Sequence, residues 1–264
     1  MLPKGDCQFS ILGRHTTRKI TTTHKPTTMS ALTQAKNSYD DILLDTNVQP
    51  IQYNLTFDVD LENFVVQAEA EIALQIKGPG VNVLVLHSLD LGIDGDSVLW
   101  SPQDGSGRRV LSDEVSTDKQ LQTVNFPFHN GPPLSGKGTL SLRWNFMLTD
   151  NLCGFYRSKY IGLDGSTRYM ATTQFEATDA RRAFPCVDEP AAKAVFVVTL
   201  IIPADRVGIS NMPMKEKTSR KDGRVMCTYE PTPVMSTYIL AFVVGEFDHV
   251  SVLTDNGVRT TVYT

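Results

Sequence analysis

The sequence predicts an all-β fold of several antiparallel sheets, arranged as a sandwich or a saddle, behind a tail without regular structure. Apolar and polar residues alternate with a period of two over several long stretches, which places one face of a strand on a core and the other in water. Turn-forming sequences separate these stretches at short intervals. No segment has the pattern of a long amphipathic helix, so the sequence favours sheets throughout.

The composition allows a large folded domain and argues against two classes of partner. The chain has 264 residues, of which 41% are hydrophobic and 20% charged, so a buried core can form. Its formal net charge is −4, whereas nucleic-acid-binding domains normally carry a basic face. No apolar run approaches the ~20 residues that span a bilayer. We therefore expect no nucleic-acid partner and no membrane span.

Residues 1–39 differ from the rest of the chain. They are rich in Thr, Lys and Arg, contain Asp6 as their only acid and show no apolar period. Such a segment cannot bury enough surface to fold, so it is predicted to be a disordered tail. A basic, hydroxyl-rich leader with few acids also suits an organelle transit peptide. The predicted location is cytoplasmic, with the transit peptide left open as an alternative.

The predicted strands follow one another from residue 51 onward. Alternation of apolar and mostly polar residues marks three of them, at 51–59, 66–76 and 140–146. Two further stretches, Ala194 to Ile202 and Tyr238 to Val244, are apolar on both faces and are predicted to be central strands covered on both sides. A short helical turn is expected between Thr178 and Ala183. The composition does not shift and no repeat is found, so residues 40–264 are predicted to form one domain.

The sequence contains no motif of a self-sufficient active site. Its five histidines include no H-E-x-x-H pair, and neither a phosphate-binding glycine loop nor a G-x-S-x-G elbow is present. The four cysteines, Cys7, Cys153, Cys186 and Cys227, form no C-x-x-C pair and are interpreted as reduced thiols, with one bridge between distant cysteines left open. No catalytic residue and no metal ligand is predicted, and whether the chain is an enzyme stays uncertain.

The segment from Tyr169 to Pro190 has an unusual arrangement of polar groups. Gln174 and Glu176 are two residues apart, so on a strand they point to the same side. A carboxylate beside an amide is a good receptor for an ammonium group, because charge-assisted hydrogen bonds need a fixed acceptor. The alternative is an ordinary surface glutamate that pairs with Arg181 or Arg182, as weak surface ion pairs are common.

Several blocks in this order carry a resemblance to a known family. They are Gly154–Tyr160 (GFYRSKY), Thr173–Cys186 (TQFEATDARRAFPC), Asp188–Ala191 (DEPA), Ser210–Pro213 (SNMP) and Thr232–Phe247 (TPVMSTYILAFVVGEF). Together they resemble the N-terminal domain of puromycin-sensitive-type zinc aminopeptidases, in the gluzincin family that includes aminopeptidase N. The similarity begins near Asn47 and runs to the last residue.

The resemblance implies a β-saddle domain that packs on a thermolysin-like catalytic domain in a hydrolase that removes N-terminal residues from peptides. It implies that Glu176 holds the free α-amine of the peptide and that Gln174 lines the pocket for the first side chain. The family's single zinc ion, its ligands, its general base and its G-A-M-E-N loop belong to the catalytic domain, beyond Thr264. This chain is therefore expected to hold no cofactor and to be inactive alone, with the peptide N-terminus and the catalytic domain as partners.

Two positions depart from the family pattern. Val187 stands where the family usually has Trp, and Val197 stands where it often has Asp. The loss of a large aromatic side chain leaves a packing gap worth ~3–5 kcal/mol if nothing fills it. We therefore expect altered packing near Val187, with no effect on Gln174 or Glu176.

Two other functional classes remain as alternatives. The chain could be a short non-catalytic binding or regulatory module derived from such an aminopeptidase, which docks on a partner through the surface that otherwise meets the catalytic domain. It could also be a generic β-sandwich adhesion module, which would give Gln174 and Glu176 no special role.

Overall fold

The structure is a computed structural model that describes residues 43–264 except for residues 104, 111 and 163. Within this part of the chain every regular element is a β-strand or a short 3-10 helix. The all-β prediction is thus confirmed. The tail predicted for residues 1–39 lies outside the described residues. Among those that are described, no helix has the length and apolar character needed to cross a membrane.

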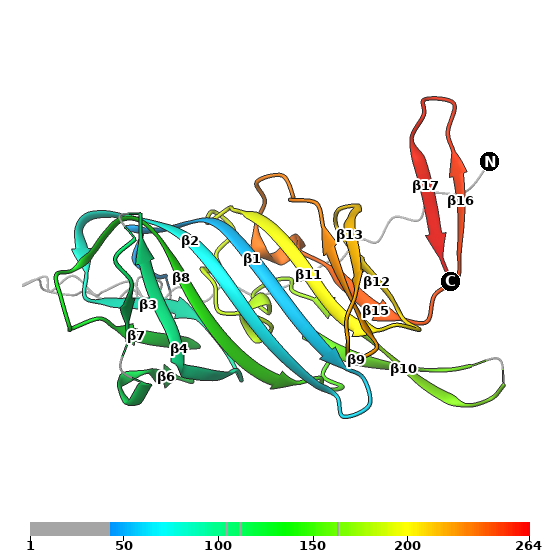
Figure 1. The fold of residues 1–264 in the computed structure, drawn as a ribbon, viewed down its shortest axis with the longest axis horizontal. Coiled ribbons are helices and arrows are strands. Elements are labelled where there is room, and N and C mark those ends of the chain that lie inside the picture. Colours follow the sequence, from blue (N-terminus) through cyan, green and yellow to red (C-terminus); the bar gives the residue numbers. More distant parts are fainter. Residues whose placement is uncertain (1–42, 104, 111, 163) are drawn as a thin grey trace, which may run out of the picture. The chain divides into compact units, whose positions relative to one another are not determined.

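The largest element is an eight-stranded sheet, seen face-on in Figure 1. Its strands, in spatial order, are β13 (Met214–Ser219), β14 (Arg224–Tyr229), β11 (Val195–Pro203), β1 (Val48–Asp60), β2 (Val65–Val81), β8 (Leu134–Met147), β4 (Gly92–Pro102) and β5 (Arg108–Arg109). The three alternating stretches of the sequence form β1, β2 and β8, which are direct neighbours at the centre of this sheet.

Burial along β1 follows the alternation with one exception. Tyr53, Leu55 and Phe57 are buried, as the period of two predicts. Ile51, which shares their period, is 41% exposed. The pairing of β1 with β2 shifts register between Pro50 and Gln52, and an extra residue in one strand rotates the side chains before it out of phase. Ile51 therefore lies outside the core.

β11 joins the sheet in a way that the sequence did not indicate. It is a central strand, as predicted, but it runs parallel to β1, with Leu55 opposite Val198. A parallel pair needs a long connection, and here residues 61–194, from β2 to the segment after η2 (Ala180–Arg182), lie between the two strands. The prediction of full cover on both faces holds only for Leu200–Ile202, because the first half of β11 alternates between buried and half-buried residues.

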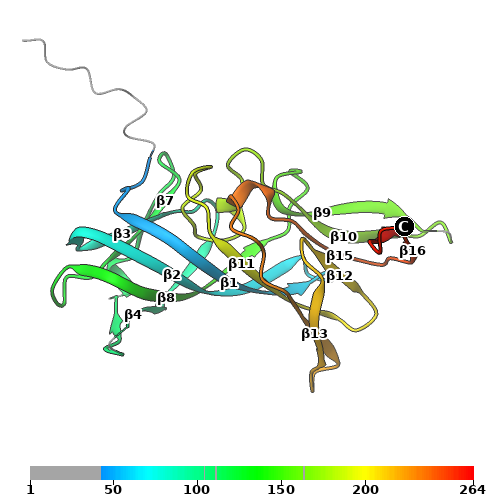
Figure 2. The ribbon, with the colours of Figure 1, turned by 90° about the horizontal axis from the view of Figure 1, so that it is seen from above.

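Three smaller sheets accompany the large one. The four-stranded sheet contains β12 (Val207–Ser210), β15 (Phe242–Gly245), β10 (Thr167–Gln174) and β9 (Gly154–Ile161). The three-stranded sheet contains β3 (Val83–His87), β7 (Thr123–Pro127) and β6 (Ser116–Asp118), and the two-stranded sheet contains β16 (His249–Leu253) and β17 (Arg259–Tyr263). Two further 3-10 helices are η1 (Ser112–Glu114) and η3 (Thr237–Ile239). Figure 2 shows β9, β10 and β15 as a layer over one face of the large sheet.

Aromatic side chains join these two layers. The Phe57 ring of β1 lies 4.8 Å from the Phe242 ring of β15 and 6.0 Å from the Phe155 ring of β9, between ring centroids. Trp144 of β8 packs edge-on against Phe57, and its indole N–H donates a 2.9 Å hydrogen bond to the carbonyl of Ala183. This contact satisfies a buried polar group and ties the segment after η2 to the large sheet.

The continuous strand predicted from Tyr238 to Val244 is wrong in its first half. Residues Thr237–Ile239 form η3, closed by a 3.0 Å bond from the Leu240 N–H to the Thr237 carbonyl, and β15 begins only at Phe242. The Thr237 hydroxyl donates a 2.7 Å hydrogen bond to Asp188, a long-range contact that local periodicity cannot reveal. The helical turn expected between Thr178 and Ala183 is present as η2.

Candidate functional site

The segment that carries Gln174 and Glu176 lies where β10 ends. Gln174 is the last residue of β10, opposite Gly154 of β9. Phe175 is 1% exposed and packs edge-on against Phe184 and Phe242, with 5.9 Å between ring centroids in each case. Its two neighbours, Gln174 and Glu176, are both exposed. The buried ring thus anchors the backbone, and the two predicted site residues project from the surface on either side of it.

Glu176 lies in a turn rather than on a strand. The turn is closed by a 2.9 Å hydrogen bond from the Asp179 N–H to the Phe175 carbonyl and continues directly into η2. The peptide bond between Glu176 and Ala177 is cis. The expectation that Gln174 and Glu176 share one side of a strand therefore has to be replaced by a strand end and a turn that expose both.

The carboxylate of Glu176 makes no hydrogen bond or ion pair with any residue that the structure describes. The alternative interpretation gave it Arg181 or Arg182 as a partner. Arg181 instead pairs with Asp188 at 3.0 Å, and Arg182 pairs with Asp179 and Asp90, each at 2.8 Å. The predicted pairing with Arg181 or Arg182 is therefore wrong, and Glu176 keeps its full capacity to accept hydrogen bonds.

A glycine allows this turn to lie close to β9. Gly154 has φ of +70°, a conformation that favours glycine. A Cβ at this position would lie 2.7 Å from the Cβ of Arg182, too close for any other residue without a shift of the backbone. The side chain of Arg182 therefore lies directly over the residue that pairs with Gln174.

Behind the exposed turn lies a cluster of buried polar side chains, made of Arg181, Asp188, Thr237 and His87, which we call the Asp188 cluster. All four are less than 7% exposed. The ion pair of Arg181 with Asp188 supports the turn. The sequence did not connect Asp188, Thr237 and His87, because only the fold brings these residues together.

The described residues offer no site for a metal ion. They contain no group of three or more His, Cys, Asp or Glu side chains placed to hold one. His87 accepts a 3.0 Å hydrogen bond at Nδ1 from the N–H of Asp188. Cys153, Cys186 and Cys227 are free thiols, and burial raises the pKa of Cys186 well above its usual value. A buried neutral thiol is a poor nucleophile, so Cys186 has a structural role.

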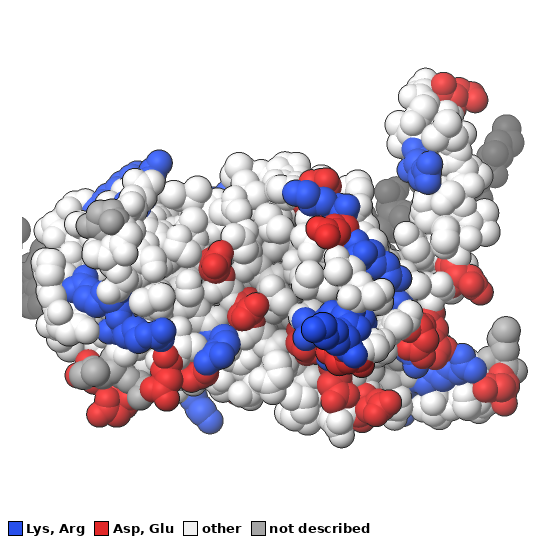
Figure 3. Space-filling view, viewed as in Figure 1, with Lys and Arg blue, Asp and Glu red and all other residues white. Residues whose placement is uncertain are grey.

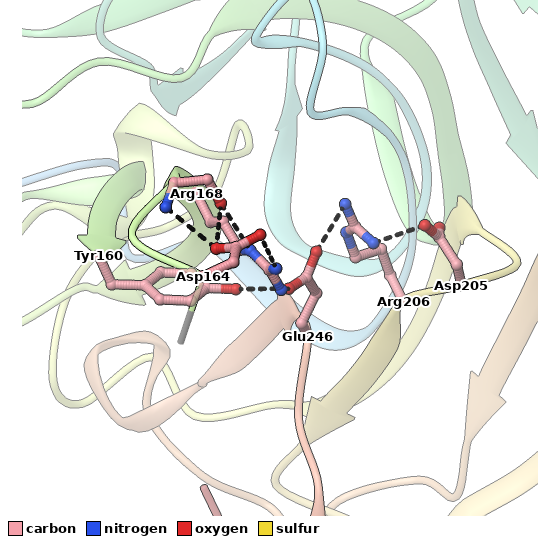
Figure 4. A network of polar contacts seen from close by, with 7 residues as sticks. Tyr160, Asp164, Arg168, Asp205, Arg206 and Glu246 are labelled. Carbon is pink, nitrogen blue, oxygen red and sulfur yellow. Dashed lines mark hydrogen bonds and ion pairs between the residues drawn. The ribbon is translucent and has the colours of Figure 1, made fainter. Parts of the chain in front are cut away.

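A second polar network lies at the surface, where the chain leaves β15 (Figure 4). Glu246 accepts hydrogen bonds from Arg168 and from the Tyr160 hydroxyl, the latter at 3.2 Å, and pairs with Arg206 at 3.1 Å. Arg168 also pairs with Asp164 at 3.0 Å. The hydrogen bond from Arg168 is the main reason that the pKa of Glu246 is lowered. Because every charge here has an opposite partner, the network holds segments together rather than offering a site.

The solvent face of the large sheet has two hollows of about 640 and 610 Å³. Polar side chains line them, including Glu69 and Arg143, and neither hollow is lined by Gln174 or Glu176. Arg143 forms an exposed ion pair with Asp94 on this face. Figure 3 shows acidic and basic side chains scattered over this face without a continuous basic surface. The face in view thus lacks the electrostatic footprint of a nucleic-acid binder.

Comparison with known proteins finds one family model and several aminopeptidases to which this chain is similar. The sequence matches the family model of the Peptidase M1 N-terminal domain over residues 49–239. It is 38% identical over 211 residues to Aminopeptidase 2, mitochondrial, of Saccharomyces cerevisiae, a match that covers 79% of this chain and 21% of the relative. It is 41% identical over 216 residues to Aminopeptidase M1-D of Oryza sativa subsp. japonica, covering 81% and 23%.

A third relative has a similar identity and coverage. Aminopeptidase M1 of Arabidopsis thaliana is 37% identical over 214 residues, covering 81% of this chain and 24% of the relative. The chain thus spans less than a quarter of the length of these curated relatives. With the family model matched over most of the described residues, and with an all-β architecture, the chain belongs to the peptidase M1 family and carries that family's N-terminal domain.

Proposed function

We propose that this chain is the substrate-anchoring domain of a zinc metalloaminopeptidase and that Glu176 holds the free α-amine of the peptide. The observation that carries the proposal is that the Glu176 carboxylate is exposed and unpaired among the described residues. This carboxylate lies on a turn that a buried phenylalanine fixes. The family to which the chain belongs acts on peptide N-termini, where an ammonium group is the feature to be recognised.

The chemistry of recognition follows from one fixed negative charge. An ammonium group offers three donors, and charge-assisted hydrogen bonds to a carboxylate are roughly twice as strong as neutral ones. Peptides with a blocked amine offer no positive charge, so Glu176 would discriminate against them. Gln174, exposed two residues earlier, would form part of the wall beside the first side chain and contribute both a donor and an acceptor.

Catalysis itself is assigned to the catalytic domain rather than to these residues. When bound there, zinc would activate a water molecule for attack on the peptide bond. The described residues hold no group that could bind it, so this domain's contribution is to bind and orient the amine. We therefore expect the chain alone to bind no stoichiometric zinc and to release no amino acids from peptides.

The test compares substrates with free and acetylated N-termini in the aminopeptidase that contains this domain. Removing a charge-assisted hydrogen bond costs roughly 1.5–3 kcal/mol, so Glu176→Ala should lower kcat/KM for the free-amine peptide about 10- to 100-fold. Turnover of the acetylated peptide should stay the same. Glu176→Gln should give an intermediate loss, because it keeps an acceptor and removes the charge.

Glu71→Ala is the matched control, because Glu71 is another exposed glutamate without an ion pair among the described residues, on the solvent face of β2. It should leave both substrates unaffected. The anchoring role is refuted if Glu176→Ala leaves cleavage of the free-amine peptide unchanged. Robust peptide turnover by the chain alone, or stoichiometric zinc in it, would refute the assignment of catalysis to the catalytic domain.

A further inference from the structure

The Asp188 cluster contains an ion pair of a different kind from the others. Arg181 and Asp188 have side-chain exposures of 8% and 1%, whereas in every other ion pair of the described residues both side chains are at least 24% exposed. Desolvating two charges costs about as much as their attraction returns, so a buried pair adds little net stability over an apolar one. What such a pair supplies is a fixed geometry for the groups that it joins.

Both oxygens of Asp188 are used, and each points to a different segment. Oδ2 accepts hydrogen bonds from Nε and the backbone N–H of Arg181, at 3.0 and 3.3 Å. Oδ1 accepts the Thr237 hydroxyl at 2.7 Å. The Asp188 N–H donates to His87 Nδ1 at 3.0 Å, at the end of β3. The carboxylate of Asp188 therefore joins η2 to η3, and the backbone N–H of the same residue links them to β3.

These two 3-10 helices are the elements next to the candidate site. η2 continues directly from the turn that carries Glu176. η3 precedes β15, and the N–H of Phe242 at the start of β15 donates a 3.1 Å hydrogen bond to the Thr173 hydroxyl, one residue before Gln174. A displacement of Asp188 would therefore move both neighbours of the exposed Gln174–Glu176 segment relative to each other.

We propose that Arg181 and Asp188 are positioning residues that set the Glu176 turn relative to η3, so that the carboxylate meets the amine in one orientation. This inference rests on the function proposed for Glu176. Neither residue touches the substrate, because both are buried behind the turn. Their effect reaches the amine only through the backbone of residues 176–181, which continues from the anchored Phe175 into η2.

Gln122 completes the arrangement at the edge of the cluster. Its Oε1 accepts a 3.0 Å hydrogen bond from Nη1 of Arg181, and its carbonyl accepts the N–H of Ser88 at 2.8 Å. Its φ of +55° is unusual for a residue other than glycine and is better tolerated by asparagine. Gln122→Asn therefore removes the hydrogen bond to Arg181, because the asparagine side chain is shorter, and its backbone tolerates the positive φ. This variant can thus test the positioning of Arg181 without a loss of fold stability.

The experiment uses the same aminopeptidase and the same pair of free and acetylated peptides. Arg181→Lys keeps the charge and approximate size, but a single ammonium cannot replace the separate donors to Asp188 and Gln122. Asp188→Asn keeps the size and removes the negative charge. Since a misplacement of about 1 Å can cost up to ~100-fold, each should lower the free-amine preference about 10- to 100-fold, mainly through KM. Gln122→Asn should lower it about three- to tenfold at unchanged thermal stability. Asp90→Asn, which removes only an exposed partner of Arg182, should change nothing.

The outcomes separate the two proposals. If Glu176→Ala abolishes the free-amine preference and the folded Arg181, Asp188 and Gln122 variants keep it, the positioning role is refuted and the anchor stands. Should Arg181→Lys or Asp188→Asn fail to fold, Gln122→Asn alone decides, because a full preference in that variant refutes the inference. If Glu176→Ala keeps the preference, the function proposed for Glu176 fails, and the positioning role fails with it.

Discussion

Val187 shows how one side chain can leave space at a buried position. It is 4% exposed and lines a hollow of about 280 Å³ between the start of β1 and residues 187–193. Leu44 and Val48 form part of the opposite wall. The sequence indicated a packing gap here, since the family usually has tryptophan at this position. Val197, the other departure, is half-buried beside Asn54 of β1, outside the core, so its change leaves no gap there.

Filling the hollow beside Val187 should stabilise the domain. Val187→Trp adds apolar surface that can be removed from water without displacing the backbone, because the space is already present. At about 25 cal/mol per Å² of apolar area, a partly covered ring should raise the free energy of unfolding by about 1 kcal/mol. Urea denaturation with a fixed m-value measures the change.

Val187→Leu serves as the control for that substitution. It adds a single methylene, so its gain should be smaller than that of the tryptophan. A decrease in stability for Val187→Trp would show that the hollow is too narrow for the ring and that the site is overpacked.

At the scale of elements, the Glu246 network connects four segments at the surface. Tyr160 comes from β9, Arg168 from β10, and Arg206 from the turn before β12, while Glu246 follows β15. Because the folded pKa of Glu246 lies below the value of 4.5 for an unperturbed glutamate, these contacts stabilise the fold above about pH 4.5. That contribution is lost as the pH falls through the lowered pKa.

Removing the main cause of that shift should be directly measurable. Arg168→Gln deletes the charged donor, so the pKa of Glu246 should rise toward its usual value, with Arg206 still lowering it in part. An NMR titration of the Glu246 carboxyl carbon reports this pKa. Arg157→Gln removes the separate ion pair with Asp150 and the contact of Arg157 with the Phe64 ring, and it should leave the titration curve in place. An unchanged curve in Arg168→Gln would contradict the assignment.

The elements also show where sequence reasoning succeeds and where it stops. β1, β2 and β8 were predictable because each buries one face, and a period of two reports that directly. The bulge at Ile51, the parallel pairing of β11 and the replacement of a strand by η3 were not, because each depends on a partner far away in sequence. The exposure of Glu176 beside a buried Phe175 followed the local pattern, whereas the Asp188 cluster required the fold.

At the scale of the whole described domain, the hairpin of β16 and β17 is its least covered part. Figure 1 shows it as a separate two-stranded sheet after β15. Val250, Val252 and Val262 are 58–69% exposed, and the register places them on one face, with Ser251 and Thr261 on the other. A two-stranded hairpin is marginal in water by itself. In the proposed enzyme, contact with the catalytic domain would cover this apolar face.

The chain alone should therefore associate with itself as its concentration rises. Unpaired strand edges and exposed apolar residues both favour this. Val252→Lys should shift the chain toward the monomer in sedimentation velocity, whereas Ser251→Lys, on the opposite face, should shift it less. A monomer at all concentrations would contradict the expectation and would favour the interpretation as an autonomous binding module.

The parallel pairing of β1 with β11 also has a consequence for synthesis on the ribosome. Leu55 pairs with Val198, so the ribosome must add 143 further residues after Leu55 before this edge of β1 can pair with β11. At about 5–20 residues per second, this interval lasts roughly 7–30 s. Throughout that time β1 and β2 can form a hairpin, but the apolar face of β1 and its outer edge stay uncovered. The nascent chain is therefore expected to be most prone to aggregation before β11 emerges.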